Sequence, residues 1–167
     1  AHMDQNGDLI GAVNDMRILK EIDSSYLNKK RKIIETSSML IFDTNLEENT
    51  ISFLLKLAED KKMIKIADAV SVEKSLKLKG KLTQLDYLRA NIDEAEILLD
   101  IVKMEDTEAA QKIKLKDRVE RIEKFYSQNK KLPKMVISAG KNGVYYLSWA
   151  GDEVKVKCFK AAAVSSE

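Results

Sequence analysis

The sequence predicts a three-layer α/β fold, in which a parallel sheet is flanked by helices and ends in a C-terminal antiparallel hairpin. Two observations support this prediction. Short apolar runs alternate with longer stretches of helical periodicity, the pattern of stacked βα units around a parallel sheet. The 167 residues are 44% hydrophobic and 34% charged, with 29 basic residues facing 27 acidic ones, and these values describe one globular domain.

The first half of the chain supplies three βα repeats. Residues 39–42 (MLIF) predict a strand that is buried on both faces. In the helix expected next, Ile51, Leu54, Leu55 and Ala58 fall on one apolar stripe. Further strands are expected at 63–67 and 85–88, and the helices that follow them at 70–79 and 91–100.

The second half closes the sheet differently. A long, solvated surface helix is expected over 107–129, and the only proline, Pro133, follows it because proline cannot continue a helix. Residues 135–137 (MVI) predict another buried strand. Residues 144–149 and 154–159 alternate around residues 150–153 (AGDE), which indicates a hairpin. We therefore expect the sheet to change from parallel to antiparallel at this point.

Composition excludes several classes of protein. Charge blocks, low-complexity tracts and a run of about 18 apolar residues are absent, so we expect no disorder, membrane span or nucleic-acid-binding arm. The single Cys158 excludes an internal disulfide and fits a reducing, cytoplasmic compartment. The single His2 leaves no Cys/His set for zinc or for a nucleophile. Residues 1–3 (AHM) look like a cloning remnant, set apart from a domain over 4–167.

Polar residues follow four of the predicted strands. The carboxyl ends of parallel strands meet at one rim of the sheet, where loops and helix N-termini converge and ligands bind. In chain order, these residues are Asp43 and Asn45, then Asp68 and Ser71, then Asn91 and Glu94, and finally Ser138, Gly140 and Gly143.

Most of these residues also have a structural interpretation. Asp43, Asn45 and Asp68 suit the N-caps of the helices that follow them, because their side chains accept from free backbone N–H groups. Asn91 and Glu94 have the spacing of a capping box. Taken singly, each position fits a helix cap better than a ligand site.

The segment Ser138-x-Gly140-x-x-Gly143 is more specific. Paired glycines let a backbone approach a phosphate while the hydroxyl and the N–H groups donate to it. A plain turn into the hairpin fits the segment equally well. It is the joint occurrence of all these residues on one rim that favours a site.

Their order resembles that of the PfkB (ribokinase-like) family of sugar and nucleoside kinases, from about residue 7 to the C-terminus. Asp43-x-Asn45, Asn91-x-x-Glu94 and Ser138-x-Gly140-x-x-Gly143 resemble three motifs of that family in the same order. Within the family, the segments 12–16 (AVNDM), 67–74 (ADAVSVEK) and 91–96 (NIDEAE) resemble the pseudouridine kinases most closely.

The resemblance implies a ribokinase-like, Rossmann-like fold and transfer of the ATP γ-phosphoryl group to the 5′-hydroxyl of a ribosyl compound such as pseudouridine. Mg²⁺ and its waters would be organised by Asn91 and Glu94. The implied residues on the substrate and phosphate side are Asp43, Asn45, Asn14, Asp15 and Lys74, the last three without an assigned chemical role. The implied nucleotide-phosphate residues are Ser138, Gly140 and Gly143.

The departures from the family are equally informative. Relatives use an Asp in a Gly-Ala-Gly-Asp loop as general base, with the loop N–H groups as anion hole, and the sequence contains no such string. The glycine-rich sugar-binding segment and most of the lid are also missing, and Ala69 and Ala90 replace prolines. We therefore expect an incomplete domain with no catalytic residue of its own, whose exposed apolar faces favour self-association into a homo-oligomer or an unusually compact fold. The alternatives are a non-catalytic, kinase-derived nucleotide-binding or interaction module, and a structural domain whose rim residues are only caps.

Overall fold

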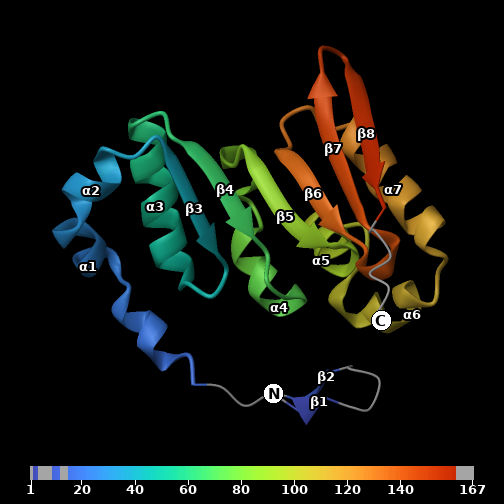
Figure 1. The fold of residues 1–167 in the computed structure, drawn as a ribbon, viewed down its shortest axis with the longest axis horizontal. Coiled ribbons are helices and arrows are strands. Elements are labelled where there is room, and N and C mark those ends of the chain that lie inside the picture. Colours follow the sequence, from blue (N-terminus) through green and yellow to red (C-terminus); the bar gives the residue numbers. More distant parts are fainter. Residues whose placement is uncertain (1, 4–8, 12–14, 161–167) are drawn as a thin grey trace, which may run out of the picture.

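The computed structural model describes residues 2–3, 9–11 and 15–160. Its centre is a six-stranded sheet in which every strand lies beside the next one along the chain (Figure 1). The strands are β3 (Met39–Asp43), β4 (Ile64–Asp68), β5 (Tyr87–Asn91), β6 (Lys134–Ser138), β7 (Val144–Ala150) and β8 (Glu153–Phe159).

The sheet is parallel from β3 to β6 and antiparallel from β6 to β8. This change of direction is the predicted one, and the hairpin turns at Gly151, whose φ is +65°. Most strand bounds lie within one residue of the predicted ones. The exception is β5, which was predicted at 85–88 and instead begins at Tyr87 and runs on to Asn91.

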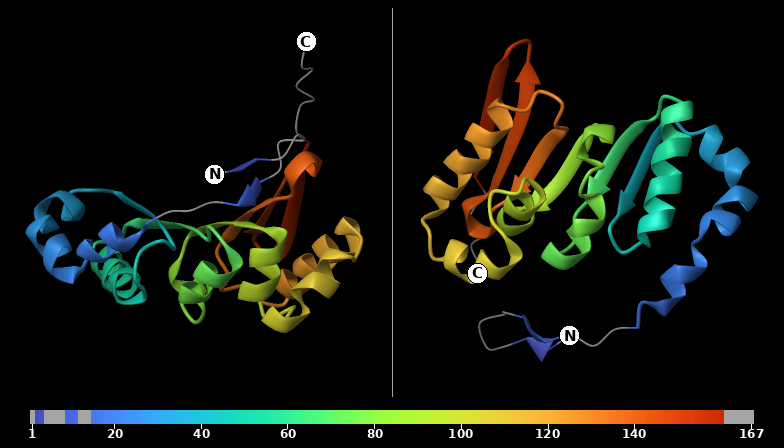
Figure 2. Two further views of the ribbon diagram at one scale, coloured as in Figure 1. Left: turned by 90° about the horizontal axis from the view of Figure 1, so that it is seen from below. Right: turned by 180° about the vertical axis from the view of Figure 1, so that it is seen from behind.

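The helices that connect the parallel strands lie together on one side of the sheet (Figure 2). The described residues thus supply two of the three predicted layers, the sheet and one helical layer. No helix in the described parts of the chain has the length and apolar character needed to cross a membrane. The helices of this layer are α3 (Glu48–Asp60), α4 (Val72–Ser75), α5 (Ile92–Leu98), α6 (Thr107–Gln111) and α7 (Leu115–Ser127), with short 3-10 helices η2 (Leu76–Leu78), η3 (Leu82–Gln84) and η4 (Met104–Asp106).

The prediction of a single helix over 107–129 was wrong, because the helix is interrupted between α6 and α7. Lys112 and Ile113 donate to carbonyl oxygens three residues back, and Lys114 is extended with φ −57° and ψ 136°. The break redirects the chain so that Val119 and Ile122 of α7 pack in the core.

The helix predicted over 70–79 is also shorter than expected. Val70 has a φ of +64°, a left-handed conformation from which no helix can start. Ser71 instead caps α4 by accepting from the backbone N–H of Lys74 at 3.3 Å. After Ser75 the chain tightens into the 3-10 helix η2.

The N-terminal part contains elements that no sequence pattern indicated. His2–Met3 forms β1, which pairs antiparallel with β2 (Leu9–Gly11), so two of the residues predicted as a cloning remnant take part in strand pairing. The 3-10 helix η1 (Arg17–Glu21) leads into α1 (Ser24–Lys29) and α2 (Arg31–Glu35). Both helices lie beyond the β3 edge of the sheet (Figure 1).

The core lies between the sheet and the helical layer. Side chains alternate along each strand, so Phe42, Leu88 and Ile137 point to the helices and are buried. The alternate side chains lie on the other surface of the sheet, here called the open face. On that face Met39 is 43% exposed and Ile41 is 67% exposed. Parallel sheets are normally covered on both faces, and the helices of the described residues cover one face of this sheet.

Candidate functional site

The strand register brings the predicted polar residues to one rim. Asp43 lies beside Asp68 across β3 and β4, and Asp68 lies beside Arg89 across β4 and β5. Asn91 lies beside Ser138 across β5 and β6. Because these positions alternate with the buried ones, all of them belong to the open face at the carboxyl ends of the strands.

Asp43 and Asn45 stabilise a loop and do not cap a helix. The backbone N–H of Asn45 and its side-chain Nδ2 each donate to the Asp43 carboxylate at 2.9 Å. Lys74 of α4 donates from Nζ to Oδ1 of Asn45 at 2.6 Å. The N-cap of α3 is Glu47, whose side chain makes no capping hydrogen bond. The structure therefore connects Asp43, Asn45 and Lys74 into one hydrogen-bonded chain.

Asp68 is paired with an arginine that the sequence did not single out. Nη1 of Arg89 donates to Oδ1 and Oδ2 of Asp68 at 3.1 and 2.9 Å. Asp68 also accepts from the backbone N–H of Val70 at 3.1 Å, and the cap of α4 is Ser71. The missed signal was positional, since Arg89 is the second residue before Asn91 and so shares its face of the sheet.

Asn91 and Glu94 form the capping box that their spacing allowed. Asn91 donates from its backbone N–H and its Nδ2 to the two carboxylate oxygens of Glu94, both at 2.8 Å, and Oδ1 of Asn91 accepts from the Glu94 N–H at 2.9 Å. Glu94 is 2% exposed. This burial raises the pKa of Glu94, the Asn91 N–H opposes the rise, and the nearby Asp68 carboxylate adds to it.

The donor set at this end of the sheet suits a magnesium ion that keeps most of its waters. No group of three or more His, Cys, Asp or Glu side chains in the described ranges could enclose a metal. Mg²⁺ usually needs only one or two carboxylates besides waters and substrate phosphates. Each Glu94 oxygen accepts one hydrogen bond from Asn91 and retains a lone pair. Asn91 and Glu94 would therefore hold such an ion through water.

The segment Ser138 to Gly143 forms a 3-10 turn, η5 (Gly140–Asn142), into β7. The hydroxyl of Ser138 donates to the carbonyl oxygen of Ala90 at 3.4 Å. Gly143 has φ +92°, and a Cβ there would overlap the main chain of Phe159, with Lys160 Cα at 2.9 Å. Gly140 has φ +54° and faces open space. The close approach of the end of β8 thus accounts for Gly143, whereas Gly140 leaves the turn accessible.

The remaining predicted residues lie elsewhere in the chain. Asn14 is outside the described residues. Asp15 is exposed and pairs with Arg17, whose Nη2 lies 2.6 Å from its Oδ2. This pair belongs to the N-terminal segment before η1. Asp15 therefore has no structural tie to the rim in the described contacts.

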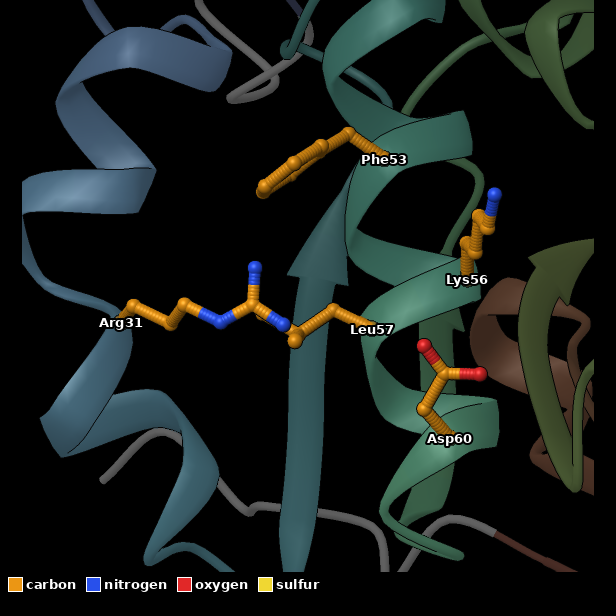
Figure 3. A pocket seen from close by; sticks show the side chains of 5 residues that line it. All are labelled: Arg31, Phe53, Lys56, Leu57 and Asp60. Atoms are coloured by element: carbon orange, nitrogen blue, oxygen red, sulfur yellow. The ribbon is translucent and has the colours of Figure 1, made fainter.

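A hollow of about 270 Å³ lies between α2 and α3, away from the strand ends (Figure 3). Arg31 reaches from α2 toward Leu57 of α3, and Phe53, Lys56 and Asp60 complete the lining. Arg31 also donates to Glu35 at 2.7 Å within its own helix. Oε1 of Glu35 also lies 3.6 Å from Nζ of Lys61, the residue after α3, so this ion pair attaches α2 to the end of α3, and no sequence motif indicated it.

A buried ion cluster connects α5 and α7. Glu96 is 1% exposed, and its Oε2 accepts from Nε and Nη2 of Arg118 at 3.0 and 2.6 Å. Asp93 accepts from the same guanidinium at 2.5 Å, and Arg121 reaches Glu96 at 3.3 Å. No local sequence pattern marks this cluster, because its partners are 22 to 25 residues apart.

Comparisons with known proteins show which family and which solved structures the chain resembles. A model of the pfkB family of carbohydrate kinases matches residues 9–166. Pseudouridine kinase of Escherichia coli (strain K12) is 27% identical over 150 residues, which make up 90% of this chain and 44% of that protein. This chain therefore spans less than half the length of that curated relative.

Solved structures show the same partial coverage. A carbohydrate kinase from Agrobacterium tumefaciens matches with a TM-score of 0.64 and 26% identity, over 92% of this chain and 44% of that one. An adenosine kinase from Anopheles gambiae, in complex with P1,P4-di(adenosine-5) tetraphosphate, matches with a TM-score of 0.60 over 84% of this chain and 42% of that one. At 14% identity the second likeness concerns the fold alone.

Proposed function

The chain belongs to the pfkB family of carbohydrate kinases, and from that premise we propose that it forms part of an ATP-dependent kinase acting on the 5′-hydroxyl of a ribosyl compound. Pseudouridine is the first acceptor to test, because the E. coli pseudouridine kinase is a relative. One observation carries the proposal. Polar side chains from adjacent parallel strands lie in register on one rim, the place where α/β proteins bind ligands.

In this proposal the rim has two halves. Asp43 and Asn45 line the substrate and phosphate side, and Lys74 is joined to Asn45 by a hydrogen bond. Ser138 and the accessible Gly140 of the 138–143 turn contact the nucleotide phosphates. Asn91 and Glu94 lie between these halves and hold Mg²⁺ through water, which neutralises phosphate charge.

The 167-residue chain by itself is proposed to bind nucleotide without transferring the phosphoryl group. The sequence has no Gly-Ala-Gly-Asp string to supply a base and an anion hole. Those groups deprotonate the acceptor and stabilise the charge that develops in transfer. This also keeps open the alternative function, a non-catalytic nucleotide-binding module derived from a kinase.

Thermal unfolding with and without ATP and Mg²⁺ tests the proposal. A ligand that binds only the folded state stabilises it by about 2.7 kcal/mol at a hundredfold excess over Kd. The wild-type midpoint should rise, and the rise should shrink in Asn45→Ala and Ser138→Ala. Ser127→Ala, at an exposed position on α7, is the matched control and should keep the full rise.

Two results would contradict the proposal. A wild-type midpoint that does not move at millimolar ATP would remove the nucleotide site. An equal rise in all four proteins would move the site away from this rim. A separate phosphorylation assay with ATP, Mg²⁺ and pseudouridine distinguishes the two functions, because clear turnover by this chain would rule out binding without transfer.

A further inference from the structure

The loop between β3 and α3 carries Asp43 and Asn45, and the neighbouring βα unit holds it in place. On one side the backbone N–H of Thr44 donates to the carbonyl oxygen of Asp68 at 3.1 Å. The Thr44 hydroxyl donates to the carbonyl oxygen of Ala69, and the Thr44 side chain is fully buried. The end of β4 therefore fixes the first turn of the loop.

Lys77 of η2 holds the same loop from the helical side. Its Nζ donates to the carbonyl oxygen of Thr44 at 3.0 Å and to that of Leu46 at 2.8 Å. Carbonyl oxygens that face the protein interior need hydrogen-bond donors, and the ammonium group of Lys77 donates to both of these. The two carbonyls flank Asn45, so Lys77 fixes the backbone on each side of a residue proposed to bind ligand.

Lys74 determines the orientation of the Asn45 side chain. An ammonium group only donates and a carboxylate only accepts. With Lys74 at Oδ1 and Asp43 at Nδ2, the amide of Asn45 has a single orientation that satisfies both neighbours. A flipped amide would place its NH₂ group against Lys74 and its oxygen against the Asp43 carboxylate.

We propose that Lys77 and Lys74 are positioning residues for the ligand-binding rim: Lys77 holds the backbone around Asn45, and Lys74 holds its side-chain amide in one orientation. The inference rests on the proposed function, because it explains how the substrate and phosphate side of that site is ordered before ligand arrives. Preordered groups bind with a smaller entropic cost than groups ordered on binding.

The test compares Lys77→Met and Lys74→Met with Lys79→Met. Lys79 follows η2 directly, and its exposed side chain pairs with Asp100 away from the loop, which makes it a matched control. Hydrogen exchange measured by NMR without ligand reports on the loop. We expect at least tenfold faster exchange of the Thr44 amide in Lys77→Met and of the Asn45 side-chain amide in Lys74→Met.

Affinity for ATP and Mg²⁺, measured by calorimetry where each variant is folded, separates positioning from general stability. We expect at least a fivefold weaker affinity in both variants, and in Lys77→Arg a partial recovery because arginine restores the donors. Unchanged exchange in both variants would overturn the inference. Faster exchange with unchanged affinity would also overturn it, since the contacts would then be structural only.

Failure of the proposed function gives a different result. If the wild-type chain binds no ATP, the kinase proposal fails, and the exchange rates still decide whether the two lysines hold the loop. Normal binding by the wild type with unchanged exchange in the variants would reject the lysines and leave the proposed function intact.

Discussion

Replacing Gly143 by alanine tests how closely the end of β8 approaches the main chain where η5 enters β7. At φ +92° and ψ −143°, Gly143 occupies a region that is essentially restricted to glycine. Forcing alanine into it costs of the order of 1–3 kcal/mol. The new Cβ would also overlap the main chain of Phe159 and lie 2.9 Å from Lys160 Cα. Moving the end of β8 away adds about 1–3 kcal/mol, as other overpacking does.

The expected loss is thus about 2–6 kcal/mol, a large part of the roughly 5–15 kcal/mol that stabilises a typical domain. Gly140→Ala is the matched control in the same turn. Gly140 has φ +54°, and among the described residues beyond its chain neighbours no atom lies within 4 Å of the position that the alanine Cβ would take. Only the left-handed backbone cost of about 1–2 kcal/mol therefore applies.

Urea unfolding followed by Trp149 fluorescence measures both variants. Trp149 is the only tryptophan in the sequence, and it lies in β7, the strand that Gly143 precedes. The free energy of unfolding should fall further in Gly143→Ala than in Gly140→Ala. If Gly143→Ala is as stable as Gly140→Ala or more stable, the end of β8 does not approach Gly143 as closely as described and the reasoning fails.

Three further predictions concern buried groups. Burial raises the pKa of Glu94 above its ordinary 4.5, so the wild type should lose stability relative to Glu94→Gln as pH rises from 4.5 through the raised pKa. If the free energies of unfolding of the two proteins, measured in urea, differ by the same amount at every pH, this prediction is refuted. Arg118→Met removes the main ion-pair partner of the buried Glu96 and should lower the free energy of unfolding in urea by about 3–5 kcal/mol. Lys116→Met, which removes an exposed ion pair, should change it by less than about 0.5 kcal/mol. Burial raises the pKa of Tyr126 to about 12, so ultraviolet titration should show its ionisation near that pH, and this step should be missing in Tyr126→Phe. The loss of stability as pH rises from 10 through about 12 should be smaller in Tyr126→Phe than in the wild type, because the pKa of Tyr145 is also raised.

The sequence predicted the fold class well because strands leave a local signal. Mainly apolar segments of three to five residues located β3, β4 and β6, and the alternation around residues 150–153 located the hairpin. The ribokinase-like fold and the pfkB family were confirmed. The helices were harder to place, because a left-handed Val70 and an extended Lys114 shorten them without any glycine or proline to mark the change.

In the candidate site, too, the residues in local motifs were predictable and their distant partners were not. Local motifs placed Asp43, Asp68, Asn91 and Ser138 on one rim, and the strand register brings them together there. Their partners were beyond reach, because Arg89 meets Asp68 from another strand, and Lys77 meets the β3–α3 loop from 31 to 33 residues away. Asn91 and Glu94 form a capping box, so their spacing reflects helix structure whether or not they also hold a metal.

The open face also sets the thermodynamic character of unfolding. The heat capacity of unfolding comes mainly from apolar surface that becomes hydrated, and averages about 12–15 cal/mol/K per residue. Met39 and Ile41 already contact water in the folded state, so they add less new hydration than fully buried side chains when the chain unfolds. The stability curve of this chain should therefore be flatter with temperature than its length suggests, and covering the open face would make that curve steeper.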